Sequence, residues 1–544
     1  MNKILILFAV AATLVFSDCT KKFDSINTDP TQASSDQFDP NLLLPTAETG
    51  YTGAIAGYGG AILYQSMWSQ IFANAEFPTY YSNGDKYVNG GSFNAYLASP
   101  WNNGYSAAGK AYEIIKLAKD KPELSNLSGI ALINELISIE LVTDVYGDCP
   151  FSQALQAKAG VTTTVYDKQQ DIYNSMLNKL DSVLPTLDAA KAKPTNDATI
   201  YAGDIAKWKK FGYSLMLRMA MRLTKADPAT AQKFVEKAFA GGTFASNADN
   251  CFIVLDDPHG FSNGNATALV VAEDYSQVRW GQLLINSLKT ANDPRLAVIA
   301  EVPKNGTANA ANEKLAGIST PALQVGMPNG YDQNGGATDI SKAPGYPGTS
   351  PADPSTNTST YTDQPNVTGK YSRPTTALYL SRSCPEFILT YAETELLLAE
   401  AAARGWNVGA SASAHYKNGL SGALQSYGTF NAAGAISAAV ADAYATANPL
   451  DITSMDNSLK QINTQFWITT GTLFNWIETW NNWRRSGYPV LTPVNYPSNF
   501  SNGTIPRRFI YPQSETSTNG ANYKAAASAL GGGDQYTSRM YWDK

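Results

Sequence analysis

The stretch AKWKKFGYSLMLRMAMRL, residues 206–223, predicts the kind of fold that this chain adopts. Its apolar residues recur at helical spacing and also occupy the opposite side of the helix: Trp208, Phe211, Leu215, Met219, Leu217 and Met221. A helix that is apolar nearly all round is buried among other elements. Arg218 and Arg222 lie one turn apart on it, and we expect both to pair with carboxylates or carbonyls, because an unpaired buried charge is too costly.

Further segments carry the helical pattern on both sides of this stretch. Residues 107–121, 130–145 and 167–184 repeat it, and residues 385–404 form the strongest C-terminal helix pattern, with Gly405 as its expected C-cap. Successive helices joined by short turns favour tetratricopeptide-like stacking of helix pairs. Residues 303–374 and 495–536 lack a helical period and are predicted to be irregular. We therefore predict a mostly α fold with long irregular tracts, which are either functional or disordered.

The N-terminus is typical of a secreted lipoprotein. Residues 4–16 are apolar apart from Thr13, a run shorter than the about 20 residues that a membrane-spanning helix needs. The run ends at Cys19, which would be acylated after removal of a signal peptide of residues 1–18; Asp18 is unusual before a lipid-bearing cysteine. An ordinary signal peptide with an incidental cysteine is the alternative. We expect residues 19–40 to form a lipid anchor and polar tether, and residues 41–544 to form a single domain.

The composition excludes several classes of function. Charged residues make up 16% and the net charge is −6, which argues against a nucleic-acid partner, while 30 Tyr and 10 Trp suit an uncharged ligand such as a glycan. The whole chain holds 2 His, too few for most His-based catalysis. Cys149, Cys251 and Cys384 show no zinc-binding spacing and allow at most one disulfide. We therefore expect no enzymatic activity and no cofactor.

An ordered set of blocks resembles the SusD/RagB family of outer-membrane nutrient-binding lipoproteins from Bacteroidetes. Each block alone is weak, but together they run in family order from residue 19 to residue 543. The blocks are CTKKFDSINTDP (19–30), TDVYGDCPFSQA (143–154), GDIAKWKKFGYSLMLRMAMR (203–222), NDPRL (292–296), YAETELLLAEAAARG (391–405), WRRSGYP (483–489), IPRRFIYP (505–512) and RMYWD (539–543). Cys149 stands where the family tends to have Val or Ile, and is most simply a buried apolar position.

The resemblance implies a helical scaffold with loops that hold the ligand. It also implies a protein anchored by lipid in the outer membrane, on its surface, acting with a TonB-dependent, SusC-like transporter. Members of the family capture oligosaccharides, or in some cases peptides, and deliver them to the transporter. The leading hypothesis is thus non-catalytic oligosaccharide capture. Peptide capture, a lipoprotein glycosidase and a pure protein-binding scaffold are the alternatives, and neither the ligand nor the membrane face follows from the residues.

Aromatic and amide side chains in residues 77–101 are the first candidates for the ligand site. Rings stack on the C–H faces of sugars, while amides and carboxylates bind the hydroxyls, although some of these rings are expected in the core. Trp101 and Tyr81 are the preferred stacking platforms. The full candidate set, which includes the middle region from which the family also draws ligand contacts, is Tyr80, Tyr81, Asn83, Asp85, Tyr87, Trp101, Tyr275, Trp280 and Tyr331.

One loop has oxygen-bearing side chains at calcium-like spacing: Asp332, Asn334 and Asp339. It lacks the terminal bidentate Glu of an EF-hand. We therefore expect no metal, with a structural calcium ion as the weaker possibility.

Overall fold

The stretch 206–223 corresponds to helix α9 (Ile205–Arg222). The side chain of Asp204 caps the helix by accepting a hydrogen bond from the backbone N–H of Lys207 at 3.1 Å. Every residue from Phe211 to Arg222 is buried. The prediction of a buried helix is confirmed, with bounds that differ by one residue at each end.

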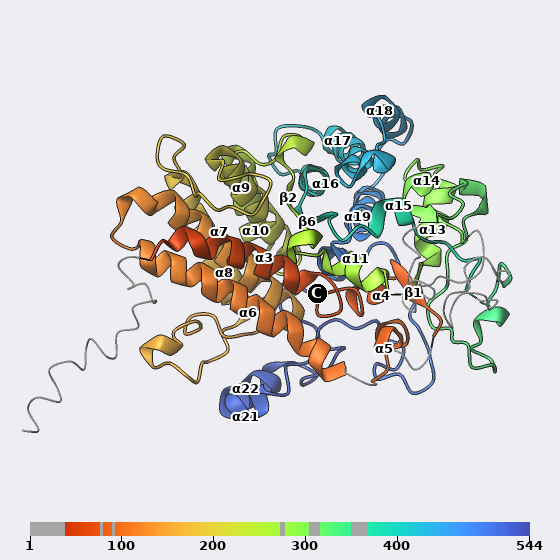
Figure 1. The fold of residues 1–544 in the computed structure, drawn as a ribbon, viewed down its shortest axis with the longest axis horizontal. Helices are drawn as coiled ribbons and strands as arrows, with labels where there is room; N and C mark the ends of the chain where they lie inside the picture. The colour runs from red at the N-terminus through yellow and green to blue at the C-terminus, as the bar shows by residue number, and fades with distance from the viewer. Residues whose placement is uncertain (1–37, 77–79, 90–92, 272–277, 304–315, 350–367) are drawn as a thin grey trace, which may run out of the picture.

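The computed structural model describes residues 38–76, 80–89, 93–271, 278–303, 316–349 and 368–544 (Figure 1). The predicted leader, Cys19 and Tyr275 lie outside these residues. Among the helices of the described ranges, none combines the length and the hydropathy that crossing a membrane requires.

Helices dominate the described chain, which confirms the predicted fold class. Besides α9 they are α3 (Leu44–Ile55), α4 (Gln65–Trp68), α5 (Tyr80–Lys86), α6 (Phe93–Ala118), α7 (Ser125–Tyr146), α8 (Gln169–Val183), α10 (Pro228–Gly241), α11 (Gly264–Leu269), α13 (Gln282–Thr290), α14 (Leu296–Ile299), α15 (Thr376–Tyr379), α16 (Tyr391–Ala403), α17 (Ala412–Gln425), α18 (Ala438–Ala447), α19 (Met455–Thr472), α20 (Trp476–Ser486), α21 (Glu515–Thr518) and α22 (Gly520–Ala529).

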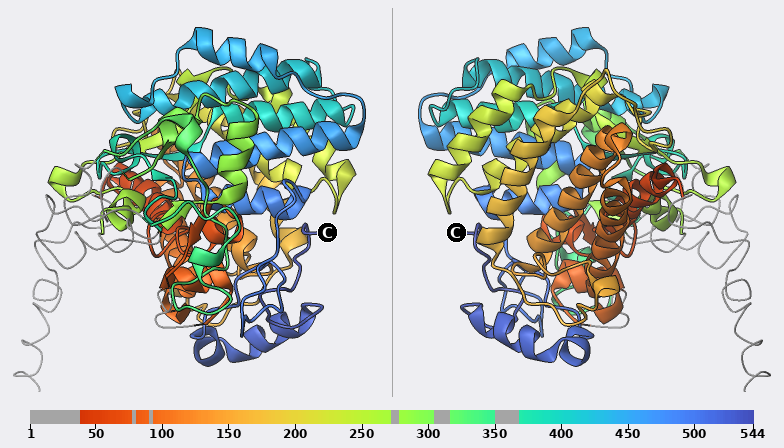
Figure 2. Two further views of the ribbon diagram at one scale, coloured as in Figure 1. Left: turned by 90° about the vertical axis from the view of Figure 1, so that its right-hand side faces the viewer. Right: turned by 90° about the vertical axis from the view of Figure 1, so that its left-hand side faces the viewer.

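Helices that follow one another in the chain pack in pairs. α6 packs against α7, α9 against α10, α16 against α17, and α19 against α20. α16 also contacts α9, so the helices of the second half join those of the first. In Figure 2 the cyan and blue helices α16–α19 lie above the red and orange helices of the first half. The loop-rich segments gather beside α5, α13 and β1, on the right of Figure 1.

Short strands join segments that are far apart in sequence. The described chain forms three antiparallel two-stranded sheets, which pair β1 with β3, β2 with β6 and β4 with β5. Their bounds are β1 (Phe72–Asn74), β2 (Cys251–Val254), β3 (Val278–Trp280), β4 (Ala300–Glu301), β5 (Arg373–Pro374) and β6 (Pro385–Leu389).

Three sequence predictions of secondary structure are wrong in part. Residues 385–389, predicted as helix, form β6 because they pair with β2; Thr390 then caps α16 by accepting from the N–H of Glu393 at 3.2 Å. Residues 77–101, predicted as a loop, contain α5 and the first turns of α6. The tract 495–536 contains α21 and α22. The expected C-cap is confirmed, since Gly405 follows α16 with a φ of +81°.

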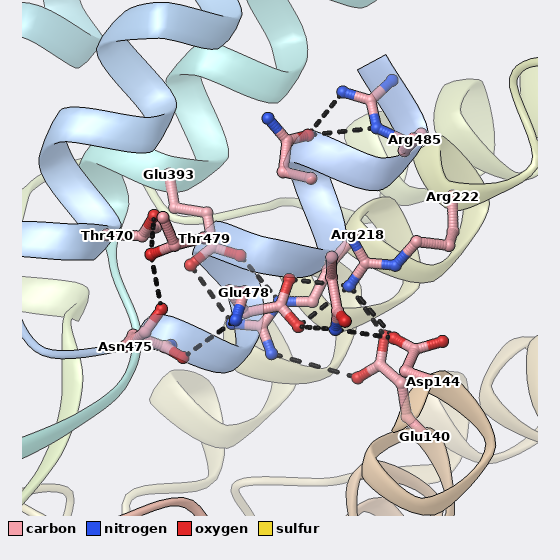
Figure 3. A network of polar contacts seen from close by, with 12 residues as sticks. Glu140, Asp144, Arg218, Arg222, Glu393, Thr470, Asn475, Glu478, Thr479 and Arg485 are labelled. Carbon is pink, nitrogen blue, oxygen red and sulfur yellow. Dashed lines mark hydrogen bonds and ion pairs between the residues drawn. The ribbon is translucent and has the colours of Figure 1, made fainter. Parts of the chain in front are cut away.

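A buried charge network crosses the middle of the helical scaffold (Figure 3). Arg218 Nε lies 2.6 Å from Glu393 Oε1, and Arg222 Nη2 lies 2.7 Å from Glu478 Oε2. The expected pairing of both arginines with carboxylates is confirmed. Glu140 lies farther away, with 3.9 Å to each arginine. Burial raises the pKa of Glu140 well above its ordinary value; Arg218 opposes this rise, while Glu478 adds to it.

Cys149 and Gly147 lie in the turn that follows α7. The Cys149 side chain is fully buried, as its apolar reading predicts. Gly147 ends α7 with a φ of +89°, a conformation that favours glycine. Asp148 then accepts from the backbone N–H of Gln169 at the start of α8, so it helps to hold the turn between the two helices.

Candidate functional site

A cleft of about 480 Å³ lies where four distant parts of the chain meet. It is bordered by Gln70, two residues after the end of α4, by the first turns of α13, by the loop 328–338 and by the segment 492–495. The lining residues are Gln70, Gln282, Leu283, Asn286, Pro328, Asn329, Gly330, Tyr331, Ala337, Thr338, Thr492, Pro493, Val494 and Asn495. We call this site the amide cleft.

The polar lining of the amide cleft is uncharged. Side-chain amides and hydroxyls come from Gln70, Gln282, Asn286, Asn329, Asn495, Thr338 and Thr492. An amide offers both donors and acceptors, and a hydroxyl can do either. This lining therefore suits a neutral ligand whose own groups donate and accept, such as sugar hydroxyls or peptide groups.

Gln70 fixes one wall of the cleft. Its Nε2 donates to the carbonyl of Thr492, and its Oε1 accepts from the Thr492 N–H at 3.3 Å. Gln70 itself has a φ of +57°, a backbone conformation that costs energy for a residue other than glycine. The reciprocal bonds therefore join the end of α4 to the segment 492–495.

Asp85 fixes the position of the loop 328–338, which forms another wall of the cleft. Its Oδ1 accepts from Asn329 Nδ2 at 2.6 Å, and its Oδ2 accepts from the Gly330 N–H at 2.9 Å. Lys86 Nζ lies 3.2 Å from Asp85 Oδ2 and donates to the Asn74 carbonyl at 2.7 Å. Burial lowers the pKa of Lys86, which the Asp85 carboxylate opposes. Asp85, predicted to bind ligand, is thus fully buried and positions the loop that does line the cleft.

Tyr331 is the predicted ligand residue that the described chain places in the amide cleft. Its ring is half-buried and packs against a small hydrophobic cluster made of Ala73, Ala75, Met327, Ile340, Ala343 and Tyr371. That cluster lies apart from the main core of the helices. Tyr331 therefore has a packed face and a face that lines the cleft.

The two preferred stacking platforms are buried, so the expectation of exposed rings is wrong for both. Trp101 is 7% exposed and lies in α6, where its ring packs edge-on against Tyr146 at 5.3 Å between centroids. Tyr81 is 1% exposed and packs edge-on against Tyr58 at 6.3 Å. Both rings belong to the main hydrophobic core because α5 and α6 are folded helices rather than a surface loop.

Three other candidates, Trp280, Asn83 and Tyr87, are also interior. Trp280 is in β3, its ring centroid 4.7 Å from that of Phe72, and its Nε1 donates to the carbonyl of Ile299 at 3.0 Å. Asn83 and Tyr87 are buried on α5 and just after it. Tyr80 begins α5. None of the buried candidates lines the amide cleft.

Tyr96, one of the aromatic residues of the candidate stretch 77–101, forms a half-buried pair with Tyr58, which sequence reasoning did not select. Their centroids are 6.4 Å apart, and the Tyr58 hydroxyl donates to the Ala268 carbonyl at 3.4 Å. A signal for Tyr58 was present, since it stands in the run Gly-Tyr-Gly-Gly at 57–60, where glycines leave a ring accessible. The amides Gln70, Gln282, Asn286 and Asn495 carry no comparable local signal.

The predicted calcium loop forms its own hydrogen bonds. Asp332 Oδ1 accepts from the Asn334 N–H at 3.0 Å, and its Oδ2 accepts from the Thr338 and Tyr496 hydroxyls, each at 2.7 Å. Asp339 accepts from two nearby backbone N–H groups. Within the described residues, no three His, Cys, Asp or Glu side chains are arranged to hold a metal ion. Calcium binding stays a prediction, which calorimetric titration of metal-free protein with calcium chloride would test.

Comparison with known proteins places the chain among outer-membrane-associated binding proteins. A family model, SusD-like 2, described as starch-binding and associating with the outer membrane, matches residues 61–512. A solved structure described as a chitin-binding protein is 29% identical, with a TM-score of 0.76, and the match covers 93% of this chain and 100% of the other. No curated protein sequence matches.

Two further solved structures share the fold. A Bacteroidetes SusD-like protein has 23% identity and a TM-score of 0.77, and the match covers 93% of this chain and 100% of that one. A chitin-binding SusD homologue from Flavobacterium johnsoniae has 23% identity and a TM-score of 0.70, with 92% of this chain and 99% of that one covered. The matching family is described as starch-binding and two of the three structures as chitin-binding, that is, as binding proteins and not as enzymes.

Proposed function

This chain belongs to the SusD-like family, and on that premise we propose that it captures an oligosaccharide in the amide cleft and delivers it to a TonB-dependent, SusC-like transporter. The observation that carries the proposal is the lining of the cleft. Amides and hydroxyls line it together with the Tyr331 ring, and among the described residues no charged side chain does. A neutral sugar needs hydrogen-bond partners of both kinds and an aromatic or apolar surface for its C–H face.

The proposed place of action is the outer membrane. The family is described as associating with that membrane, which supports a partner there. We propose that acylated Cys19 anchors the chain and that residues 19–40 act as a tether, with the folded part on the cell surface. The transporter follows from the family resemblance, and co-purification of the two proteins from membranes would test it.

Peptide capture is the second candidate. Amides also bind peptide groups, so the lining of the cleft admits an uncharged peptide backbone. In the part of the chain that the structure describes, no charged side chain lines the cleft to bind a peptide terminus, which favours the sugar. A glycosidase needs a pair of carboxyl groups about 5–9.5 Å apart at the bond that it cleaves, and the lining of the amide cleft contains no carboxyl group.

Titration calorimetry with chitin and starch oligosaccharides, and with short neutral peptides, tests the proposal. We expect saturable binding of at least one oligosaccharide without release of product. The variant Tyr331→Ala should weaken binding roughly 5- to 30-fold, because an aromatic face contributes about 1–2 kcal/mol. Asn286→Ala, on an exposed part of the cleft wall, should also weaken it.

Asn178→Ala is a matched control. Asn178 is an exposed amide on α8, outside the cleft, and its loss should leave affinity unchanged. Binding that is insensitive to both cleft variants would place the ligand elsewhere. Binding of the peptides alone would favour the second candidate.

A further inference from the structure

A second cavity, of about 360 Å³, lies between α3, the loop that precedes α11, and β6. It shares no lining residue with the amide cleft. The polar residues that line it are Thr49, Thr52, Ser262, Asn263 and Glu386. Unlike the amide cleft, it therefore contains an ionisable group.

Glu386 is held as a carboxylate acceptor. It is 3% exposed and lies on β6, opposite Ile253 of β2. Asn263 Nδ2 donates to its Oε2 at 2.8 Å, and Asn265 Nδ2 lies 3.2 Å from Oε1 and 3.3 Å from Oε2. Both carboxyl oxygens thus face N–H donors.

The orientation of both amides is fixed by the backbone. Asn263 Oδ1 accepts from the Ala266 N–H at 2.9 Å, where it caps α11. Asn265 Oδ1 accepts from the Gly57 N–H at 2.8 Å. Because each amide oxygen binds a backbone donor, each Nδ2 is the group that must face Glu386.

Glu386 has no counter-charge. Within the described chain it makes no ion pair, whereas the buried Glu393 and Glu478 each contact an arginine. Burial raises the pKa of Glu386 to about 8, and the hydrogen bonds from Asn263 and Asn265 oppose the rise. The adjoining titratable group is the buried thiol of Cys384, whose pKa burial also raises. The site thus has the donors that a carboxylate needs, but lacks a cation.

The hydroxyl groups of the cavity can only accept from a ligand. Thr49 Oγ1 donates its hydrogen to the Pro45 carbonyl at 2.6 Å, and Thr52 Oγ1 donates to the Thr49 carbonyl at 3.1 Å. Ser262 Oγ donates to Asp257. The lone pairs of these oxygens stay available, so the lining presents acceptors and one carboxyl group.

We propose that this cavity binds a primary ammonium group, with Glu386 as its counter-ion. An ammonium carries a positive charge and three N–H donors and has no acceptor, which complements this lining. Apolar groups border the rest of the cavity, including Leu255 and the ring of Phe261, which is 59% exposed. They provide a surface for the carbon skeleton of the ligand. The proposal does not depend on the function of the amide cleft.

Titration calorimetry with 1-butylammonium chloride at pH 7 tests the site directly. We expect saturable binding of one equivalent, and no binding of 1-butanol, which has the same chain without the charge. Because burial raises the pKa of Glu386 and a bound cation favours its carboxylate form, binding should be accompanied by proton release. Titrations in buffers of different ionisation enthalpy measure that release. Equal binding of 1-butanol, or no saturable binding of the ammonium, would overturn the proposal.

Three variants locate the binding. Gly53→Leu fills the cavity from α3, since a Cβ at Gly53 meets nothing within 4 Å, and it should abolish binding while Glu386 stays in place. Thr52→Val removes one acceptor and should weaken binding several-fold, and Glu386→Gln should weaken it at least tenfold. If Glu386→Gln fails to fold, Gly53→Leu alone still tests whether the ammonium binds in this cavity. Unchanged affinity in Gly53→Leu would mean that the ammonium binds elsewhere.

The source of the amine is distinguished by further titrations. Glucosamine and 1,4-diaminobutane both carry a primary ammonium. Tighter binding of glucosamine would identify an amino sugar as the natural class of ligand, and tighter binding of 1,4-diaminobutane would identify an aliphatic amine. N-Acetylglucosamine has the sugar but no ammonium, and we expect it not to bind here. If it binds with the affinity of glucosamine and Gly53→Leu abolishes both, the carboxylate is not the recognition element and the proposal fails.

Discussion

The buried glutamates of this protein differ in the groups that their carboxyl oxygens contact. Glu478 receives bonds from Arg222 Nη2 at 2.9 and 2.7 Å, while Glu140 stays 3.9 Å from either arginine and one of its oxygens has no hydrogen-bond partner. Glu386 has amide donors and no cation. The same residue type therefore acts as a salt-bridge partner, a carboxyl group whose pKa burial raises, and a proposed ligand contact.

The first prediction compares two glutamates of the charge network. Glu478→Gln leaves Arg222 buried without its closest carboxylate and should cost about 3–5 kcal/mol of unfolding free energy. Glu140→Gln should change it by less than about 1 kcal/mol, because the raised pKa of Glu140 already favours its neutral form. Urea unfolding of both variants measures the difference. Equal losses would show that Glu140 is ionised and paired.

His415 is predicted to make stability depend on pH. Its Nδ1 lies 2.9 Å from Glu395 Oε2 and its Nε2 lies 2.9 Å from the Val408 carbonyl, so both ring nitrogens must donate and the ring must be cationic. Burial lowers the pKa of His415, but the hydrogen bond and charge of Glu395 raise it overall above 6.5. The stabilisation is therefore complete below pH 6.5 and is lost as the pH rises through the folded-state pKa.

Double-mutant cycles between His415→Gln and Glu395→Gln measure that contribution. The coupling energy from thermal unfolding should be largest at pH 6 and should fall towards pH 9. A coupling that stays constant over this range would mean that the pair is not ionic.

At the scale of elements, helix α5 contacts both the half-buried pair of Tyr58 and Tyr96 and the loop that lines the amide cleft. Tyr81 on this helix packs against Tyr58 of the half-buried aromatic pair, and Asp85, one turn later, holds the loop that lines the amide cleft. The helical pattern of residues 77–101 is weak in the sequence because Asn, Gly and Asp interrupt it. Packing against the core stabilises this helix, and the aromatic rings become interior as a result.

Trp101 and Tyr331 should respond in opposite ways to truncation. Trp101→Ala removes a core ring of α6 and should lower stability by about 3–5 kcal/mol, with affinity per folded molecule unchanged. Tyr331→Ala should weaken the ligand and cost less stability, because its ring is only half-buried. Melting curves and calorimetry on the same samples separate the two effects. Lost affinity in correctly folded Trp101→Ala protein would restore Trp101 as a ligand platform.

At the scale of the whole molecule, the site depends on contacts between distant segments. Gln70, Gln282, Tyr331 and Thr492 approach one another only because β1 pairs with β3 and the end of α4 bonds to the segment 492–495. The helical scaffold supports these segments, and the loops supply the polar groups.

Attachment to the membrane is predicted to depend on Cys19. Two or more acyl chains on this cysteine would give stable anchoring without a spanning helix. Cys19→Ala should therefore release the protein into the soluble fraction, as immunoblots of separated membranes would show. A variant that stays with the outer membrane in a strain without the transporter would contradict the lipid anchor.

The sequence by itself determined the helical class, the buried helix α9 with its paired arginines, the cap at Gly405 and the mainly irregular character of residues 316–349, because helix periodicity and caps are local. Only the tertiary structure decided that residues 385–389 form a strand, that Trp101, Tyr81 and Trp280 are interior, and that amides from four segments line one cleft. The physical reason is that strand pairing and the exposure of a ring depend on partners that lie far away in the chain. No local pattern records those partners.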